Sequence, residues 1–286
     1  MTTVVTAAAG NVGRHAVSRL AEAGHTVRAV VRSESSADAL RAPSVEPVVA
    51  DLESGVPPGL FDGADRALLV VPVTESLVRT ANALTDAAAA AGLDRVVRVS
   101  IDSAFVEGGD VLGRAHAEAD RHLAASGLRF TALRPAGFMQ NLLGMAPMVQ
   151  QGVIAAPTGE GEIPFVDAAD IAAAAVAVLT GRSDATGPVD LTGPEALSFG
   201  DVAEKLSALT GRPVAHVSPS EDEARAGFAA VGLSPWLADA MVANAALVAR
   251  GAGSAVRDGV ERLTGRPPRS LDAFLAEHAA AFQPAS

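Results

Sequence analysis

The chain of 286 residues contains no cysteine, no tyrosine and a single lysine, Lys205. Without tyrosine, a tyrosine–lysine pair cannot serve as the general acid of a dehydrogenase-type site. Without cysteine, the chain has no thiolate nucleophile, disulfide framework or cysteine zinc site. The six histidines are scattered, and even His116 and His122 are six positions apart, so they do not share a helix face. The sequence therefore predicts no metal site.

Positive charge is also scarce, with 22 Lys and Arg against 33 Asp and Glu and a net charge of −11. Proteins that bind the phosphate backbone of nucleic acids rely on clustered cations, so this balance argues against a nucleic-acid partner. The opening MTTVV runs into a strand pattern without a basic flank and an apolar signal core. No apolar run approaches the roughly 20 residues of a membrane span. We therefore expect a cytoplasmic protein without a membrane partner.

Short β-branched runs alternate with longer Ala- and Leu-rich helical patterns in the first half of the chain. Runs such as ALLVV at 67–71 lack polar alternation, which is typical of strands covered on both faces. The predicted strands are 3–6, 26–31, 45–50, 67–71, 95–99 and 128–133, and the predicted helices are 11–23, 34–41, 75–91 and 113–126. This alternation predicts an α/β protein with a doubly wound parallel sheet.

The regularity loosens after about residue 135. The predicted helices there are 168–180, 198–210, 221–231, 235–250 and 270–282, and the predicted strands are 188–192 and 213–217. We expect this part to form mainly a smaller lobe on the carboxyl edge of the sheet, where open α/β folds bind ligands. The expected division is therefore 1–135 and 136–286, with some later segments returning to the sheet.

The run TAAAGNVGRH at 6–15 follows the first strand and opens the first helix. Gly10 and Gly13 have the spacing that lets a backbone approach a pyrophosphate and lets the helix pack closely on the strand, while Asn11 and Val12 offer N–H groups at the helix start. The alternative is a tight turn that needs glycine for packing alone. We favour dinucleotide binding.

Five further residues predict how a nucleotide is held. Arg32 ends the second strand, where an arginine pairs with the 2′-phosphate of NADP and an acid would bind the ribose of NAD; a solvated arginine is the alternative. Asp51 and Leu52 follow the third strand and either flank an adenine or begin a turn. Val71 and Pro72 follow the fourth strand and face the same edge. The predicted cofactor is NADP(H).

Further motifs occur in order with these: RVSIDS at 98–103, HAEADRHLAASGLRFTALRP at 116–135, GFMQN at 137–141, PFVDAADIA at 164–172 and LTGPEALSF at 191–199. Together they resemble the NmrA-like family of atypical short-chain dehydrogenase/reductases, over nearly the whole chain. The resemblance implies a Rossmann fold and a homodimer. One position departs from the family pattern, because Ala7 stands where the family has its first glycine. If that position needs a positive φ, alanine costs roughly 1–2 kcal/mol there.

The resemblance also supplies candidate catalytic and substrate-binding residues. His116 occupies the position of a lysine or histidine in related reductases, and an imidazole there could bind the nicotinamide ribose or deliver a proton near neutral pH. Ser100 and Ser103 follow the fifth strand and either polarise a substrate carbonyl or only terminate the strand. The loop after the sixth strand is implied to border the cofactor and a flat apolar substrate through Pro135, Phe138, Met139 and Asn141.

Three functions follow from these motifs. The first is an NADPH-dependent reductase of a quinone or another conjugated planar carbonyl compound, which needs orientation and an oxyanion donor more than a strong acid. The second is a non-catalytic NADP(H) sensor, favoured by the missing Tyr/Lys pair and by Ala7. The third is a tailoring enzyme acting on a polyketide-like aromatic substrate. We favour the reductase.

Overall fold

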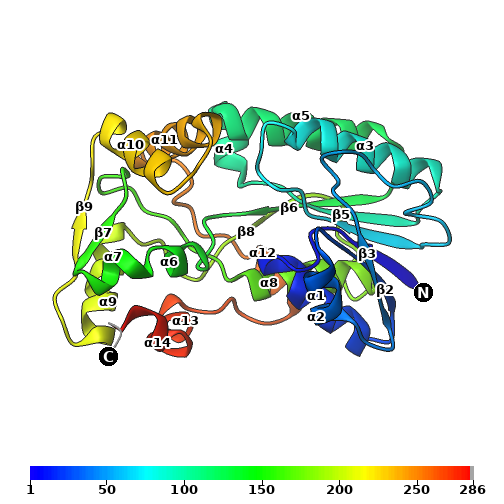
Figure 1. Ribbon diagram of the computed structural model, residues 1–286, viewed down its shortest axis with the longest axis horizontal. Coiled ribbons are helices and arrows are strands. Elements are labelled where there is room, and N and C mark those ends of the chain that lie inside the picture. Colours follow the sequence, from blue (N-terminus) through cyan, green and yellow to red (C-terminus); the bar gives the residue numbers. More distant parts are fainter. Residues whose placement is uncertain (284–286) are drawn as a thin grey trace.

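The central feature is a parallel sheet of seven strands in the order β3-β2-β1-β4-β5-β6-β8 (Figure 1). The computed structural model describes residues 1–283. The strands are β1 (Thr2–Val5), β2 (Thr26–Val31), β3 (Val45–Val49), β4 (Arg66–Leu69), β5 (Arg95–Val99), β6 (Phe130–Pro135) and β8 (Gly187–Leu191). The order changes direction between β1 and β4, so the carboxyl ends of these strands border the crevice where such folds bind ligands. The predicted doubly wound α/β fold is confirmed.

Helices cover both faces of the sheet. One face packs against α1 (Asn11–Glu22), α8 (Ala168–Leu179) and α12 (Gly259–Thr264), and the other against α3 (Leu77–Ala90) and α5 (Val111–Ala125) (Figure 1). The strands are therefore buried on both sides, as their continuous apolar runs predict. Helix α2 (Glu34–Leu40) follows β2 at the edge of the sheet, and α4 (Ser103–Gly108) lies between β5 and α5.

Helix α1 shows how the sequence produces this arrangement. Its apolar residues Val12, Ala16, Val17 and Leu20 recur at helical spacing and are all buried, while Gly24 beyond its end adopts a φ of 81°. They pack against the small alanine side chains of α8, in which only three of the twelve residues are not buried. Residues from the first and second halves of the chain thus share one core.

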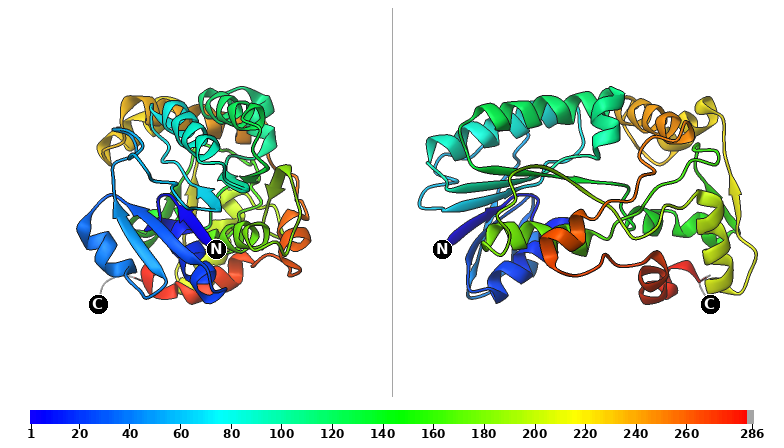
Figure 2. Two further views of the ribbon diagram at one scale, coloured as in Figure 1. Left: turned by 90° about the vertical axis from the view of Figure 1, so that its right-hand side faces the viewer. Right: turned by 180° about the vertical axis from the view of Figure 1, so that it is seen from behind.

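The smaller lobe lies at the end of the molecule opposite the N-terminus (Figure 2). Its elements are α6 (Asn141–Gly144), α7 (Ala146–Gln150), β7 (Val153–Ala155), α9 (Phe199–Thr210), β9 (Ala215–Val217), α10 (Glu221–Ala230), α11 (Pro235–Ala249), α13 (Leu271–Glu277) and α14 (Ala279–Phe282). Strands β7 and β9 pair in parallel, and most of the other elements enclose a second apolar core around Phe165, Phe199 and Phe274. No helix within residues 1–283 is long and apolar enough to cross a membrane.

The structure differs from the predicted elements mainly in short segments. Helices α4, α6, α7 and α12 and strand β7 contain three to six residues each, too few to show a periodic pattern. The predicted helix 270–282 is two helices, α13 and α14, separated at His278. The longer elements begin and end within about two residues of their predicted bounds, which is the usual uncertainty of helix ends.

Candidate active site

The turn between β1 and α1 contains the one non-glycine residue with a positive φ within residues 1–283. Ala7 has a φ of 48°, and its carbonyl accepts a hydrogen bond from Gly10 N–H at 2.9 Å. An alanine in this left-handed conformation costs about 1–2 kcal/mol relative to an unstrained backbone. Alanine at position 7, where the family pattern has glycine, therefore holds a strained backbone conformation.

Gly13 allows α1 to approach this turn. A Cβ atom at Gly13 would lie 2.3 Å from the carbonyl oxygen of Ala7 and 2.7 Å from Cα of Ala8. These distances are too short for any side chain, so the position requires glycine. Gly10 is the N-cap of α1, and no side chain accepts from the first N–H groups of this helix. In contrast, Asp110 and Asp167 cap α5 and α8 in that way. The start of α1 therefore leaves its N–H groups for an anion.

A pocket of about 430 Å³ opens beside this turn, at the carboxyl ends of β1, β2 and β3. Six of the predicted cofactor residues line it: Ala7, Gly10, Arg32, Asp51, Leu52 and Pro72. The sequence did not single out the other lining residues, Ala9, Val30, Val31, Ser36, Ala50 and Glu53. A mostly apolar lining with a few polar groups is typical of a small-molecule site.

Asp51 both lines the pocket and organises a turn. Its carboxylate accepts from Glu53 N–H at 3.1 Å and from the Ser54 hydroxyl at 2.7 Å, and these bonds hold its pKa below the usual value, with a smaller contribution from Arg32. Asp51 can therefore both begin a turn and flank an adenine, the two interpretations that the sequence left open. Arg32 itself is exposed at the wall of the pocket.

Five predicted cofactor residues do not line this pocket. Val12 and Gly13 are buried between α1 and the sheet, and Pro135 is buried at the end of β6. Asn11 is exposed at the start of α1, and Val71 is half-buried directly before Pro72. The positions of these five residues agree with the predicted site at the carboxyl edge of the sheet. A direct contact with a nucleotide stays a prediction for each of them.

His116 lies on the buried face of α5, with an exposed fraction of 6%. Its Nδ1 is 3.1 Å from a guanidinium nitrogen of Arg98 on β5. Burial lowers the pKa of His116 to about 3, and the positive charges of Arg98 and Arg134 add to this shift. The expectation that its pKa suits proton delivery near neutral pH is therefore wrong, because the ring stays neutral there.

Asp120, one helical turn after His116, is the centre of a buried ionic network. Its carboxylate accepts from Arg98 on β5 and, at 3.0 and 3.2 Å, from Arg134 on β6. Removing a charge from such a group is costly, because its partners would be left buried and unpaired. The network therefore fixes α5 against β5 and β6 at the carboxyl edge of the sheet.

Ser100 and Ser103 belong to the same network. The Ser100 hydroxyl donates to Asp120 at 2.9 Å, and the Ser103 hydroxyl donates to Asp190 at 2.7 Å while accepting from Arg134 at 3.0 Å. Both hydroxyl protons are thus used inside the protein. This arrangement agrees with a structural role and does not favour polarisation of a substrate carbonyl.

The loop after β6 separates into buried and accessible residues. Met139 is 1% exposed and packs in the core of the smaller lobe, so apolar packing accounts for its side chain, and its assignment to the substrate pocket stays a prediction. Phe138 is half-buried, and Asn141 is exposed at the start of α6. These two side chains remain available to border a substrate.

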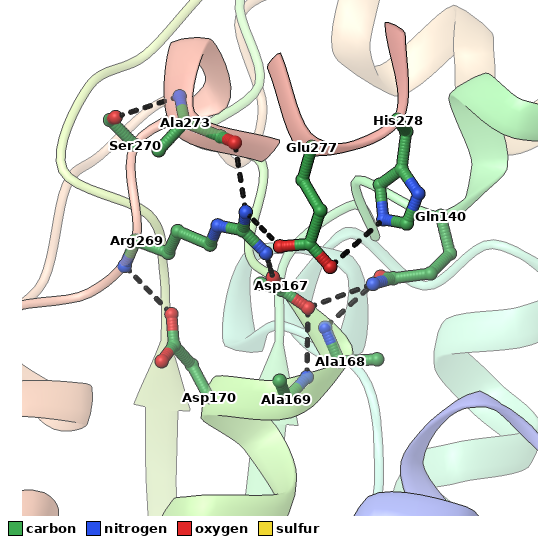
Figure 3. Close-up of polar contacts among 10 residues, drawn as sticks. All are labelled: Gln140, Asp167, Ala168, Ala169, Asp170, Arg269, Ser270, Ala273, Glu277 and His278. Atoms are coloured by element: carbon green, nitrogen blue, oxygen red, sulfur yellow. Dashed lines mark hydrogen bonds and ion pairs between the residues drawn. The ribbon is translucent and has the colours of Figure 1, made fainter. Parts of the chain in front are cut away.

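A second polar cluster ties this loop to α8 and to the C-terminal helices (Figure 3). Gln140 donates to Asp167 at 2.8 Å and accepts from Ala168 N–H at 3.0 Å. Arg269 donates to Asp167 at 3.1 Å and also binds Glu277. Asp167 is 2% exposed, and although burial opposes it, these hydrogen bonds bring its pKa below the usual value. The cluster joins the sheet and the smaller lobe beside the loop.

The sequence reasoning missed Arg98, Asp120, Arg134 and Asp190. A usable signal was present: Arg98 and Arg134 lie inside mostly apolar strands, and an arginine on a strand of a sheet that is covered on both faces requires a carboxylate partner. Asp120 stands four positions after His116, which places both on one helix face. Which carboxylate would pair with which arginine depends on tertiary packing.

The chain is similar to known proteins over nearly its whole length. The model of the NmrA-like family matches residues 1–225. An NAD(P)H azoreductase from Xenophilus azovorans is 35% identical over 281 residues, which cover 98% of each chain. A Streptomyces griseus enzyme named (4-alkanoyl-5-oxo-2,5-dihydrofuran-3-yl)methyl phosphate reductase is 34% identical over 98% of this chain and 99% of its own. The NADPH complex of an NADPH-dependent quinone oxidoreductase from Escherichia coli superposes with a TM-score of 0.83 at 26% identity, over 97% of this chain and 98% of the other.

Proposed function

The chain belongs to the NmrA-like family, and on this premise we propose that it is an NADPH-dependent reductase that transfers a hydride to a quinone or another conjugated planar carbonyl compound. Relatives of full length are an NAD(P)H azoreductase and a quinone oxidoreductase. Each reduces an electron-poor conjugated group according to its name. The proposal extends that chemistry to this chain.

The observation that carries the proposal is the pocket beside the start of α1. Its volume of about 430 Å³ and its place at the strand crossover suit the adenosine part of a dinucleotide. The close approach that Gly13 permits and the uncapped N–H groups after Gly10 suit a pyrophosphate. Arg32 and Ser36 stand in the pocket wall with the chemistry to bind a 2′-phosphate. These residues therefore fit NADP(H).

Bound NADPH supplies the hydride. The protein needs to orient the substrate and stabilise the negative charge that develops on its oxygen. A neutral imidazole can donate a hydrogen bond to such an oxygen without giving up its proton, and His116 is assigned this role or the binding of the nicotinamide ribose. Phe138 and Asn141 are assigned to the substrate pocket. The product is a stabilised quinol or enol, so a strong protein acid is not required.

Two titrations test the proposal. The purified protein is titrated with NADPH and with NADH while the fluorescence of the reduced cofactor is followed, and turnover is then measured with quinones, enones and azo dyes. We expect tighter binding of NADPH and consumption of NADPH with at least one quinone. Failure to bind either cofactor would refute the proposal, and a preference for NADH would refute the role of Arg32 alone.

The same measurements separate the reductase from a sensor. A sensor would bind NADP(H), distinguish its oxidised and reduced forms and turn over none of these substrates. A tailoring enzyme would bind the cofactor and act only on polyketide-like aromatic compounds. We retain the reductase because the full-length relatives named above are reductases.

The remaining proposals concern organisation. We assign residues 1–135 mainly to cofactor binding and 136–286 mainly to the substrate, with α8, β8 and α12 belonging to the sheet. We also propose a cytoplasmic homodimer without a nucleic-acid partner. Light scattering coupled to size exclusion checks the dimer, and a mass of 28.8 kDa, that of a single chain, would contradict it.

A further inference from the structure

Arg98 connects His116 to the ionic network through the two ends of one guanidinium group. One terminal nitrogen binds a carboxylate oxygen of Asp120, and the other lies 3.1 Å from Nδ1 of His116. The side chain is 1% exposed, so water does not compete for these bonds. Asp120 is in turn held by Arg134 and Ser100. The position of the guanidinium is thus determined from several elements.

The chemistry of arginine decides which nitrogen of the imidazole carries the proton. A guanidinium group has donors only and remains protonated in proteins. Nδ1 of His116 must therefore offer a lone pair to Arg98, and the proton of the neutral ring is on Nε2. Among residues 1–283, the bond from Arg98 is the one hydrogen bond that the ring makes, so the Nε2–H group donates to none of these residues.

The charges around the ring oppose a second proton. Arg98 faces it from β5 and Arg134 from β6, and both are positive, while Asp120 on the same helix is the carboxylate between them. Asp190 on β8 joins through Ser103, and Asp102 stands at the start of α4. Burial opposes a second proton most strongly, and two arginines against one directly bound carboxylate add an excess of positive charge beside His116.

We propose that Arg98 is a positioning residue for the reaction: it holds His116 as the neutral Nε2–H tautomer, so that the imidazole acts as a permanent hydrogen-bond donor and not as a proton-transferring acid. The inference rests on the proposed function for its catalytic consequence. The tautomer itself does not depend on any substrate. In this proposal, Asp120 holds Arg98 in place.

Nitrogen-15 NMR of the cofactor-free protein tests the tautomer. The ring of His116 is assigned by comparison with His116→Gln. We expect a single neutral tautomer protonated on Nε2, with no titration between about pH 5 and 9. A ring protonated on Nδ1, or one that titrates near neutral pH, would overturn the proposal whether or not any substrate is turned over.

Arg98→Met tests the cause. This substitution removes one cation and leaves Asp120 paired with Arg134 and Ser100, so the network stays balanced. We expect both tautomers of His116 and a pKa that rises but stays below its ordinary value of 6.5, because burial and Arg134 remain, together with a new pH dependence of kcat on the acid side of that value. The expected loss of kcat at pH 8 is about tenfold, with binding of NADPH changed less than about twofold. Arg98→Lys, which keeps a donor, should restore most of the Nε2–H population.

Arg95→Met is the matched control. Arg95 lies on the same strand, is 2% exposed and donates to the carbonyl oxygens of Val178 and Ser183 on the opposite side of the sheet. This variant should lose stability without any change in the His116 signals or in the pH profile. If it changes the tautomer as Arg98→Met does, or if Arg98→Met leaves the tautomer unchanged, the positioning role is wrong. If Arg98→Met does not fold, the wild-type spectrum and Arg98→Lys still decide the question.

Discussion

At the scale of single residues, Ala7 holds a backbone conformation that suits glycine, directly before the helix that faces the proposed pyrophosphate. We expect Ala7→Gly to relieve the left-handed strain and to remove a methyl group from the pocket wall. The expected result is a gain of up to about 1 kcal/mol in the free energy of unfolding, because the added chain entropy of glycine offsets part of the relief. The Ala7→Gly variant should also bind NADPH more tightly. Urea denaturation and a fluorescence titration measure the two effects.

Ala9→Gly is the control for that substitution. Ala9 lies in the same turn and lines the same pocket, but its φ is not positive. Glycine there should therefore lower stability by about 0.5–1 kcal/mol through chain entropy. Equal effects of the two substitutions would show that the positive φ of Ala7 has no special cost.

Arg32 determines cofactor preference at the same scale. Arg32→Ala should weaken binding of NADPH by about 10–100-fold, since a charge-assisted bond to a phosphate contributes roughly 1.5–3 kcal/mol. Binding of NADH should change little, because that cofactor has no 2′-phosphate. Arg41→Ala, at the exposed end of α2 and paired with Asp38 at 3.7 Å, is the control and should affect neither. Equal weakening of NADPH and NADH would contradict the assignment.

At the scale of elements, Arg269 joins the segment before α13 to the N-terminus of α8 through Asp167 (Figure 3). Among residues 1–283, removing it leaves the carboxylate of Asp167 buried with the Gln140 side chain and the N–H group of Ala169 as its partners. We expect Arg269→Ala to lower the free energy of unfolding by about 2–3 kcal/mol, less than for a fully buried pair because the arginine is partly exposed. Thermal denaturation measures this change.

Glu277→Ala removes the other carboxylate that Arg269 binds. Its side chain is 59% exposed, so the substitution should cost less than about 1 kcal/mol. Limited proteolysis should release the C-terminal helices faster in Arg269→Ala than in Glu277→Ala. The opposite order would mean that Asp167 does not depend on Arg269.

At the scale of the whole molecule, the neutral state of His116 couples stability to pH. Its pKa is about 3 in the folded chain and near 6.5 in the unfolded chain, so the unfolded state binds the extra proton between these values. Stability from this group is therefore present above pH 6.5 and is lost as the pH falls. Between pH 7 and pH 5 the expected loss is roughly 2 kcal/mol. Urea denaturation of the wild type and of His116→Gln at both pH values checks this loss. An equal change in the free energy of unfolding between the two pH values in both proteins would contradict it.

The sequence was sufficient for the fold and for half of the site. Long elements with clear periodicity, such as α1 and α8, and the glycine turn with Arg32 and Asp51 depend on local patterns, and these patterns are visible in one sequence. The burial of Met139 and the partners of His116 depend on contacts between β5, β6, α5 and the smaller lobe. Such contacts join residues far apart in the chain, so local spacing cannot predict them.

The packing of α1 on α8 has a consequence for how the chain folds. Helix α1, which starts the nucleotide pocket, ends at Glu22, whereas its partner α8 begins at Ala168, so about half of the chain must be synthesised between them. Contacts this distant in sequence slow folding and leave the apolar face of α1 exposed in the meantime. A fragment of residues 1–135 should therefore aggregate or unfold without cooperativity, and the nascent chain should need residues through β8 before the first half becomes resistant to protease.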